Sequence, residues 1–288
     1  MEFSVVIPTF ERPEYLRELL KALSKQSLDG AFEVIVVNDG GEPLGPIVQP
    51  FQDSLLLKLL RQPNGGPAKA RNLGAHSASG RWLVFVDDDC VPTETWLDKM
   101  LEACHSRPSC AIGGRVVNLL SHNAYAEASQ LLVDFLYEYY QDGRRGRFFT
   151  TNNLAVPKER FWEVGGFDEG FSGAAAEDRE FCDRWSYCGN DLFYEPGIVV
   201  GHAHGLTLAG FLGQHFGYGC GARRYWKLRR ERSGDGAMFE PGKFYAGLLS
   251  YPTRRYGRSA RGFRTTLLFA LAQLANAAGY FLGKRVDS

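Results

Sequence analysis

Two patterns of apolar positions alternate along the first hundred residues. Short continuous apolar runs are typical of buried strands, whereas apolar residues that recur every three or four positions are typical of helices. The runs predict strands at residues 3–7, 32–37, 55–60 and 81–86. The periodic stretches predict helices at residues 12–25 and 67–78. Strands separated by helices of this length favour a parallel sheet with right-handed crossovers.

The second hundred residues follow a less regular pattern. It predicts helices at residues 94–104, 124–140 and 175–188, and strands at 111–117, 148–156 and 192–200. Beyond residue 205 the chain becomes rich in arginine and aromatic residues, and residues 206–232 are predicted to form one long helix. Residues 265–283 carry no charge. That length is borderline for a membrane-spanning helix, so this stretch predicts either a helix in a membrane interface or a core or dimer helix.

Charge is distributed unevenly, although the 288 residues carry no net charge. Residues 205–288 contain 14 Lys and Arg against 4 Asp and Glu, a balance of +10, which leaves −10 on residues 1–204. Arginines precede the uncharged stretch, and Lys284 and Arg285 follow it. Such asymmetry indicates different partners for the two segments, and the basic one suits an anionic membrane surface. No nucleic-acid recognition motif accompanies the basic residues, so a nucleic-acid partner is not predicted.

The six cysteines show no paired spacing of the kind that holds zinc. Free thiols in a chain of this size favour a reducing compartment. The first residues pass directly into a predicted strand, without a basic region followed by an apolar stretch, so no secretory signal is predicted. We therefore expect a cytoplasmic protein, peripheral at the inner face of the cell membrane.

Three consecutive carboxylates, Asp87, Asp88 and Asp89, follow the apolar run that ends at Val86. Like charges at the end of a buried strand repel one another and lose hydration. A divalent cation offsets that repulsion and prefers hard oxygen ligands. The alternative is a solvated Asp-rich turn.

Two further strand ends carry polar signatures, and we expect them at the same edge of the sheet. The first strand is followed by Pro8, Thr9, Glu11 and Arg12, and the second by Asp39. A glycine-rich loop then opens a predicted helix. Its backbone N–H groups and basic side chains suit a phosphate-bearing ligand; the residues concerned are Asn64, Gly65, Lys69 and Arg71.

At this point the chain resembles a known family, the inverting nucleotide-sugar glycosyltransferases of family 2, which have the GT-A fold. The resemblance covers roughly residues 3–204. It rests on seven blocks in the expected order: residues 5–12, 34–40, 64–74, 83–89, 152–155, 164–169 and 176–181.

The resemblance implies roles for individual residues on the donor side. Thr9, Glu11 and Asp39 would line the nucleoside pocket, with Arg71 beside the base or the phosphates. Asp87 would contact the ribose, and Asp89 would bind Mg²⁺ or Mn²⁺ at the diphosphate. Asp88, the spacer between them, is grouped with the donor-binding residues. The complete predicted donor-binding set is Pro8, Thr9, Glu11, Arg12, Asp39, Asn64, Gly65, Lys69, Arg71, Asp87 and Asp88.

The resemblance also implies a catalytic base, Asp178, which would deprotonate an acceptor hydroxyl. Asp178 lies near a helix N-terminus, so it is alternatively only a capping residue. Acceptor-side positions are Asn152, Asn153 and Glu177. A histidine after the last predicted strand, for which we favour His202 over His204, would complete the metal site.

Taken together, the sequence predicts an α/β protein with a Rossmann-like, mostly parallel sheet flanked by helices and a helical, basic C-terminal extension. Residues 1–204 are predicted to form the GT-A domain, with a nucleotide-binding half at about 1–110 and an acceptor half at about 111–204. The predicted reaction moves a sugar from a UDP- or GDP-type donor to a saccharide or lipid-linked acceptor, as in polysaccharide or glycolipid biosynthesis. A nucleotidyltransferase and a non-catalytic nucleotide-sugar-binding protein are the alternatives.

Overall fold

The computed structural model describes the chain except for residues 29–31, 142–145, 172, 174, 235–238 and 284–288. Its strands are β1 (Phe3–Thr9), β2 (Phe32–Asn38), β3 (Leu57–Arg61), β4 (Trp82–Phe85), β5 (Cys90–Pro92), β6 (Ala111–Asn118), β7 (Leu154–Pro157) and β8 (Leu192–His202). Its α-helices are α1 (Pro13–Leu23), α2 (Gly45–Val48), α3 (Pro67–His76), α4 (Trp96–Ser106), α5 (Ala124–Tyr140), α6 (Lys158–Glu163), α7 (Glu177–Tyr187), α8 (Leu208–Ser233), α9 (Gly242–Tyr256) and α10 (Ala260–Leu282). Two short 3₁₀ turns occupy Gln49–Phe51 and Thr151–Asn153.

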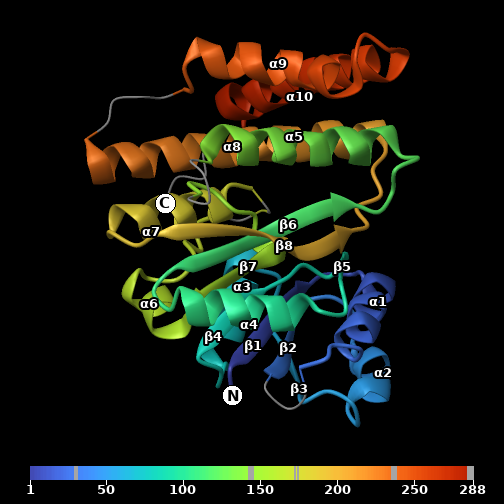
Figure 1. The fold of residues 1–288 in the computed structure, drawn as a ribbon, viewed down its shortest axis with the longest axis vertical. Helices are drawn as coiled ribbons and strands as arrows, with labels where there is room; N and C mark the ends of the chain where they lie inside the picture. The colour runs from blue at the N-terminus through green and yellow to red at the C-terminus, as the bar shows by residue number, and fades with distance from the viewer. Residues whose placement is uncertain (29–31, 142–145, 172, 174, 235–238, 284–288) are drawn as a thin grey trace.

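All eight strands form one sheet in the order β3-β2-β1-β4-β7-β6-β8-β5 (Figure 1). Strands β3, β2, β1 and β4 are mutually parallel, which confirms the predicted βα pattern. The second half is mixed, because β7 runs antiparallel to β4 and β6, and β5 runs antiparallel to β8. The carboxyl ends of β1, β2 and β4 therefore meet at one edge, as the sequence predicted.

Two apolar cores cover the two faces of the sheet. Val5 and Ile7 of β1 face a core that includes Leu16 and Leu20 of α1. Val6, the residue between them, faces the other core together with Ala70 of α3. Alternate residues thus point to opposite buried faces, which explains why the strands are continuously apolar rather than alternating.

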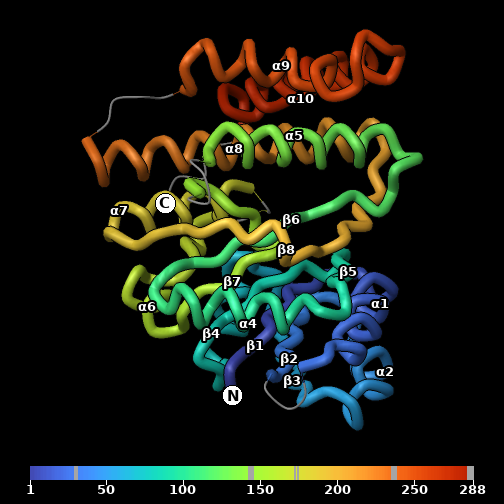
Figure 2. Tube along the Cα trace, viewed as in Figure 1, coloured from blue at the N-terminus to red at the C-terminus, as the bar shows by residue number. Residues whose placement is uncertain are grey.

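A layer of helices covers the sheet edge that carries the site (Figures 1 and 2). Helices α5, α8, α9 and α10 share a third apolar core, which includes Phe135, Phe211, Leu248 and Phe269. Helix α8 follows the predicted long helix closely, and α10 contains the predicted uncharged stretch. The predicted flanking residues Lys284 and Arg285 lie outside the described residues.

Glycines bring α8 and α10 into backbone contact. A Cβ atom added at Gly219 of α8 would lie 1.9 Å from the Asn276 carbonyl oxygen, and one at Gly279 of α10 would lie 1.9 Å from the Phe216 carbonyl oxygen. No side chain fits at these separations. The extension therefore packs through close helix contacts, although glycines usually weaken a helix.

One predicted strand was wrong in its first half. Residues 148–156 were predicted to be extended, but a 3₁₀ turn forms at Thr151–Asn153 and the strand begins only at Leu154. The Asn153 side chain donates to the carbonyl oxygens of Arg115 and Ile198. These long-range hydrogen bonds fix a turn that apolar periodicity does not reveal.

Candidate functional site

The end of β1 is joined to the carboxylate triplet by hydrogen bonds. The Thr9 hydroxyl donates to Asp88 Oδ2 at 2.7 Å. The Arg12 guanidinium lies 3.3 Å from Asp88 and 3.0 Å from Asp89. Burial raises the pKa of Asp88 to about 7, although Thr9 and Arg12 act in the opposite direction. Asp88 therefore contacts the first strand end through Thr9 and Arg12.

Asp89, His202 and His204 form a group suited to a metal ion, because each offers one ligand atom and these atoms lie within 4.8 Å of one another. The β5–β8 pairing places Cys90 opposite His202, and so brings the triplet next to the end of β8. Asp89 Oδ1 lies 3.2 Å from His202 Nε2, and Asp89 Oδ2 lies 3.1 Å from His204 Nδ1. Both histidines thus reach Asp89, whereas the prediction favoured His202 alone.

The electrostatics of this group keep Asp89 ionised. Burial opposes ionisation, but the hydrogen bonds with His202 and His204 and the charge of Arg12 hold the pKa of Asp89 well below its usual range. Burial by itself would lower the pKa of His202, yet the Asp89 carboxylate raises it overall. Asp89 Oδ1 is buried and accepts no well-aligned hydrogen bond within the part of the chain that the structure describes. One carboxylate oxygen and two imidazole nitrogens are a fitting donor set for Mn²⁺.

The glycine-rich loop is held by Asp39, at the end of β2. Its carboxylate accepts hydrogen bonds from Gln62 Nε2 at 2.7 Å, from the Gly65 N–H at 2.8 Å and from the Gly66 N–H at 2.9 Å. Gly66 has a φ of +87°, which L side chains rarely adopt, so glycine is required there. Asp39 consequently orders the loop as well as lining the cavity.

Arg71 connects the donor side to the predicted base. Its guanidinium donates to Asp87 at 2.6 Å and to Glu177 at 2.9 Å. Arg71 is 3% exposed, and despite burial the two carboxylates raise its pKa above the usual value. A permanently charged arginine thus joins the end of β4 to the start of α7.

Asp178 lies in the first turn of α7, one residue beyond Glu177. Burial, followed by the charge of Glu177, raises its pKa above the usual value. Its Oδ1 accepts the Arg179 N–H at 2.7 Å, which opposes this shift. A carboxyl group whose pKa is raised takes up a proton more readily near neutral pH, as a general base must.

One cavity of about 1370 Å³ joins these groups. It is lined by the predicted residues Pro8, Thr9, Arg12, Asp39, Arg71, Asp87, Asp88, Asp89, Asn152, Glu177, Asp178 and His202, together with His204. It is larger than the roughly 300–1,000 Å³ typical of a pocket for one small molecule.

Four predicted donor residues and one predicted acceptor residue lie outside this lining. They are Glu11, Asn64, Gly65, Lys69 and Asn153. Glu11, Asn64 and Lys69 are exposed, whereas Gly65 holds Asp39 through its backbone. Asn153 is fully buried, and its side-chain oxygen accepts the Trp96 Nε1–H at 2.9 Å. In the structure Asn153 therefore forms hydrogen bonds within the core.

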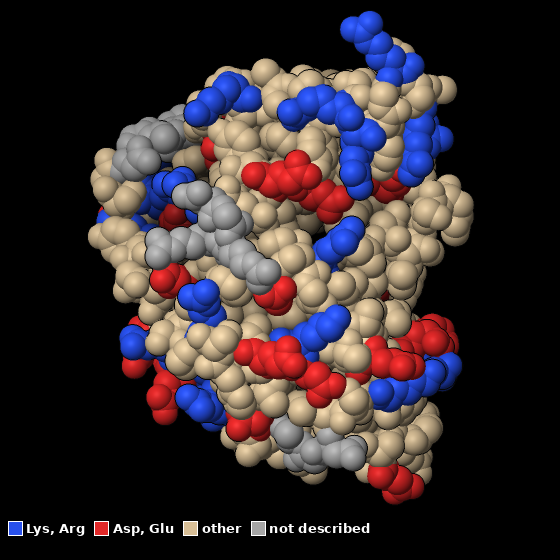
Figure 3. Space-filling view, in the orientation of Figure 1, with Lys and Arg blue, Asp and Glu red and all other residues tan. Residues whose placement is uncertain are grey.

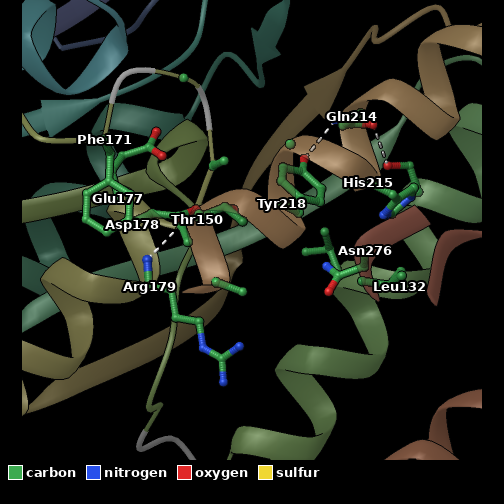
Figure 4. Close-up of a pocket in the computed structure, with 18 of the residues that line it drawn as sticks. Leu132, Thr150, Phe171, Glu177, Asp178, Arg179, Gln214, His215, Tyr218 and Asn276 are labelled. Carbon is green, nitrogen blue, oxygen red and sulfur yellow. Dashed lines mark hydrogen bonds between the residues drawn. The ribbon is translucent and has the colours of Figure 1, made fainter. Parts of the chain in front are cut away.

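Sequence reasoning missed the cavity wall that the extension supplies. Gln214, His215 and Tyr218 of α8 and Asn276 of α10 line the same cavity as Asp178 (Figure 4). The sequence signal was present, because residues 206–232 combine glycines, aromatics and polar side chains, which is unusual for a helix that only covers a core.

Helix α8 also holds α7, the helix that begins at the predicted base. Arg232 of α8 lies 2.8 Å from Glu180 and 3.1 Å from Asp183. Arg224 pairs with Asp168 at 2.9 Å. Charge-assisted contacts of this kind restrict the orientation of α7 relative to the sheet.

Comparison with known proteins accords with this geometry. The model of the family described as Glycosyl transferase family 2 matches residues 4–165. Validoxylamine A glucosyltransferase of Streptomyces hygroscopicus subsp. limoneus is 32% identical over 237 residues, which cover 71% of this chain and 49% of that protein. Chondroitin synthase of Pasteurella multocida (strain Pm70) is 30% identical over 214 residues, 62% of this chain and 22% of that protein. The chain spans about half the length, or less, of these relatives.

Solved structures share the fold over nearly the whole chain. The mannosyltransferase PcManGT from Pyrobaculum calidifontis, in complex with GDP-Man and Mn²⁺, superimposes with a TM-score of 0.70 at 16% identity over 98% of this chain and 88% of that one. S. aureus TarS 1–349, in complex with UDP-GlcNAc, gives a TM-score of 0.58 at 18% identity over 97% and 89%. The predicted α/β GT-A fold with a helical extension is confirmed. The match of the family model over more than half of the sequence shows that this chain belongs to glycosyltransferase family 2.

Proposed function

We propose that this protein is a metal-dependent, inverting glycosyltransferase that moves a sugar from a UDP- or GDP-type donor to a hydroxyl group of a saccharide or lipid-linked acceptor. The observation that carries the proposal is the shared cavity, which brings Asp178 together with the triplet at Asp87–Asp89. The similar structures support the donor class, because they hold GDP-Man with Mn²⁺ and UDP-GlcNAc. The comparisons do not favour a nucleotidyltransferase.

Mg²⁺ or Mn²⁺ would be held by Asp89, His202 and His204. When bound, the ion would neutralise charge that develops on the departing diphosphate. Thr9 and Asp39 would bound the nucleoside pocket, and Asp87 would accept hydrogen bonds from the ribose. Arg71 would keep Asp87 and Glu177 in position through the two hydrogen bonds described above.

Asp178 would act as the general base. As the acceptor oxygen forms its bond to the anomeric carbon, the bond from that carbon to the phosphate oxygen breaks, and Asp178 takes the acceptor proton. The nucleoside diphosphate leaves on the opposite face, so that the configuration inverts. The raised pKa of Asp178 favours this proton transfer near neutral pH.

We assign residues 1–204 to the catalytic domain and residues 205–288 to a helical extension that completes the acceptor side. The nucleotide-binding half would comprise about residues 1–110 and the acceptor half about 111–204. The extension shares an apolar core with α5, which supports a role in the site rather than in a separate unit. Asn152 and Glu177, both of which line the cavity, remain the proposed acceptor-side residues.

We further propose that α10 lies against an anionic membrane on the cytoplasmic side. Among the described residues it is the one helix long and apolar enough to cross a bilayer, and 28% of its most apolar stretch is buried. Phe263, Leu267, Leu274 and Phe281 expose 58–68% of their surface. Lys and Arg side chains gather at the end of the molecule where α9 and α10 lie (Figure 3). Arg254, Arg255 and Arg258 are exposed there, which suits anionic head groups.

A vesicle co-sedimentation assay tests the membrane proposal. The chain should pellet with phosphatidylglycerol vesicles and should pellet less with phosphatidylcholine vesicles or at high salt. Leu274→Glu with Phe281→Glu should release it, whereas Leu56→Glu, an exposed leucine before β3, should not. Equal pelleting of all three proteins would remove the proposal.

A nucleotide-sugar panel tests the function. We expect one UDP- or GDP-sugar to raise the melting temperature in the presence of Mn²⁺ and to be hydrolysed slowly to the nucleoside diphosphate. Chelation of the metal should abolish both effects. Absence of protection by every member of the panel would contradict the proposed donor class.

A further inference from the structure

The cavity continues beyond Asp178 into a compartment that the helical extension builds. Its walls come from α5, α8, α9 and α10, and the residues that matter for binding are Leu132, Leu136, His215, Tyr218, Leu248 and Asn276. Figure 4 shows Tyr218 between Asp178 on one side and His215, Asn276 and Leu132 on the other. The family match ends at residue 165, so three of the four helices lie outside it.

His215 presents an unused polar atom in this compartment. The residue is 2% exposed, and its Nε2 has no hydrogen-bond partner among the described residues. Its ring packs edge-to-face on Phe211 and Tyr218, which fixes its orientation. Burial lowers its pKa to about 4, so the imidazole is neutral at pH 7. A buried polar atom without a partner is costly, and a ligand hydroxyl that bonds it removes that cost.

Tyr218 connects this compartment to the base. Its hydroxyl oxygen accepts a hydrogen bond from Gln214 Nε2 at 2.8 Å, which leaves its proton available for a second partner. Burial raises the pKa of Tyr218, and the charges of Asp178 and Glu177 raise it further. Tyr218 and Asp178 line the same cavity (Figure 4). A ligand that contacts both residues has one hydroxyl beside the base.

Apolar side chains form part of the remaining walls, beside polar ones such as Gln130 of α5 and Gln273 of α10. Leu132 and Leu136 of α5 face the space from one side, and Phe244 and Leu248 of α9 from another. Phe244 and Leu248 are almost fully buried, at 7% and 1% exposed. Polar groups and apolar side chains on the walls of one cavity are typical of a site that orients a ligand by hydrogen bonds and binds it through hydrophobic burial.

We propose that this compartment is an acceptor subsite for an amphiphilic glycoside, a sugar joined to a hydrocarbon chain. His215 and Tyr218 bind sugar hydroxyls, and Leu132, Leu136 and Leu248 contact the chain. The inference rests on the proposed transferase function and narrows its acceptor class. The hydrocarbon comes either from a membrane lipid or from a soluble alkyl glycoside, because both present the same chemistry.

A chain-length series tests the subsite. Methyl, hexyl and octyl glucosides and maltosides, below their micellar concentrations, would be titrated into the protein with Mn²⁺ and the donor that the panel identifies. The acceptor KM should fall about tenfold for each two methylenes until the compartment is filled. A KM that does not change with chain length overturns the inference. If the acceptor KM falls further with a glycolipid in vesicles than with the soluble glycosides, the hydrocarbon chain comes from a membrane lipid.

Two conservative variants locate the effect. Tyr218→Phe and His215→Leu should each raise the acceptor KM about tenfold and leave donor protection against melting unchanged. Leu132→Ser should flatten the chain-length dependence. Matched controls are Tyr187→Phe and Leu56→Ser, at exposed residues whose relative exposures are 60% and 58%. An unchanged acceptor KM in folded Tyr218→Phe and His215→Leu overturns the proposal.

The donor assays separate the two possible failures. Loss of donor protection and hydrolysis in the unmodified chain would contradict the proposed function itself. Normal donor hydrolysis with no preference for alkyl chains would contradict only the acceptor subsite. Melting temperatures of all variants, measured without substrate, show whether each variant is folded.

Discussion

The parallel half of the sheet, β1–β4, and the helical extension build walls of the same cavity in opposite ways. In the first, the polar groups follow the ends of β1, β2 and β4 directly in the sequence. In the second, the polar groups sit within α8 and α10, two helices that are in close backbone contact at Gly219 and Gly279. The polar groups at strand ends thus follow from local sequence, whereas the wall that the extension supplies depends on packing between helices.

This difference has a consequence for mutation. A substitution in the triplet at the end of β4 should act first on the chemistry of the site, because Asp87, Asp88 and Asp89 line the cavity. A substitution at the α8–α10 contact should instead weaken the acceptor side through the packing itself. Asp178 lies where the two regions meet, because α8 holds α7 through Arg232.

The largest effect is expected for Asp178→Asn. Amide replacement keeps the shape and removes the base, so the transfer rate should fall on the order of 10³-fold. Donor protection against melting should persist, because Asp178 is not placed on the donor side. Asp53→Asn, at an exposed position, is the control. Near-normal turnover in Asp178→Asn would contradict the role of Asp178 as the base and would support the alternative that it only caps α7.

The next effect is expected for Asp89→Asn. The substitution removes the one charged ligand of the proposed metal group, so metal-dependent donor binding should weaken on the order of 10²-fold. Titration of Mn²⁺ followed by donor protection measures the loss. If Asp89→Asn bound Mn²⁺ as tightly as the unmodified chain, the metal would have to lie elsewhere.

The metal group shows where sequence reasoning succeeds and where it stops. The triplet after an apolar run predicted a cation site, a signal that is local, and the family resemblance assigned the ion to Asp89, which the structure groups with His202 and His204. Its contact with His204 depends on the pairing of β5 with β8, and β5 is only three residues long. A strand of three residues is too short to show a periodic pattern in the sequence. The sequence therefore identified His202 and His204 as candidate metal ligands but did not reveal that both lie beside Asp89.

The extension shows the same limit on a larger scale. Helix α8 and the uncharged stretch of α10 were predicted from composition, but α9 was not predicted at all. The inward orientation of His215 depends on which face of α8 meets α10, and that choice depends on Gly219 and Gly279. Close backbone contact between distant segments leaves no pattern in either segment alone.

Gly219→Ala should break the packing that distinguishes the extension. The added methyl group would meet the Asn276 carbonyl oxygen, and such overpacking costs about 1–3 kcal/mol. Urea unfolding measures the loss of stability, and acceptor KM should rise while donor binding is kept. Gly217→Ala on the same helix meets nothing within 4 Å, so it should be neutral or slightly stabilising. Equal stability of the two variants would contradict the close contact.

The smallest effect is expected for the pH dependence of transfer, which separates the titration of Asp178 from that of His202. The base acts as a carboxylate, and its pKa is raised, so kcat/KM should rise up to tenfold per pH unit through that pKa and level off above it. This rise in the pH–rate profile should lie well above the usual carboxyl pKa of about 3.9.

His202 must also lose its proton to bind a metal, and its raised pKa predicts a second limb of the pH–rate profile, which rises in the same direction. The two limbs separate under excess Mn²⁺, because metal competes with the proton at His202 and shifts only that limb to lower pH. A limb that Mn²⁺ does not move belongs to the base, whereas complete suppression of the limb by Mn²⁺ would assign it to the metal site and contradict the raised pKa of Asp178.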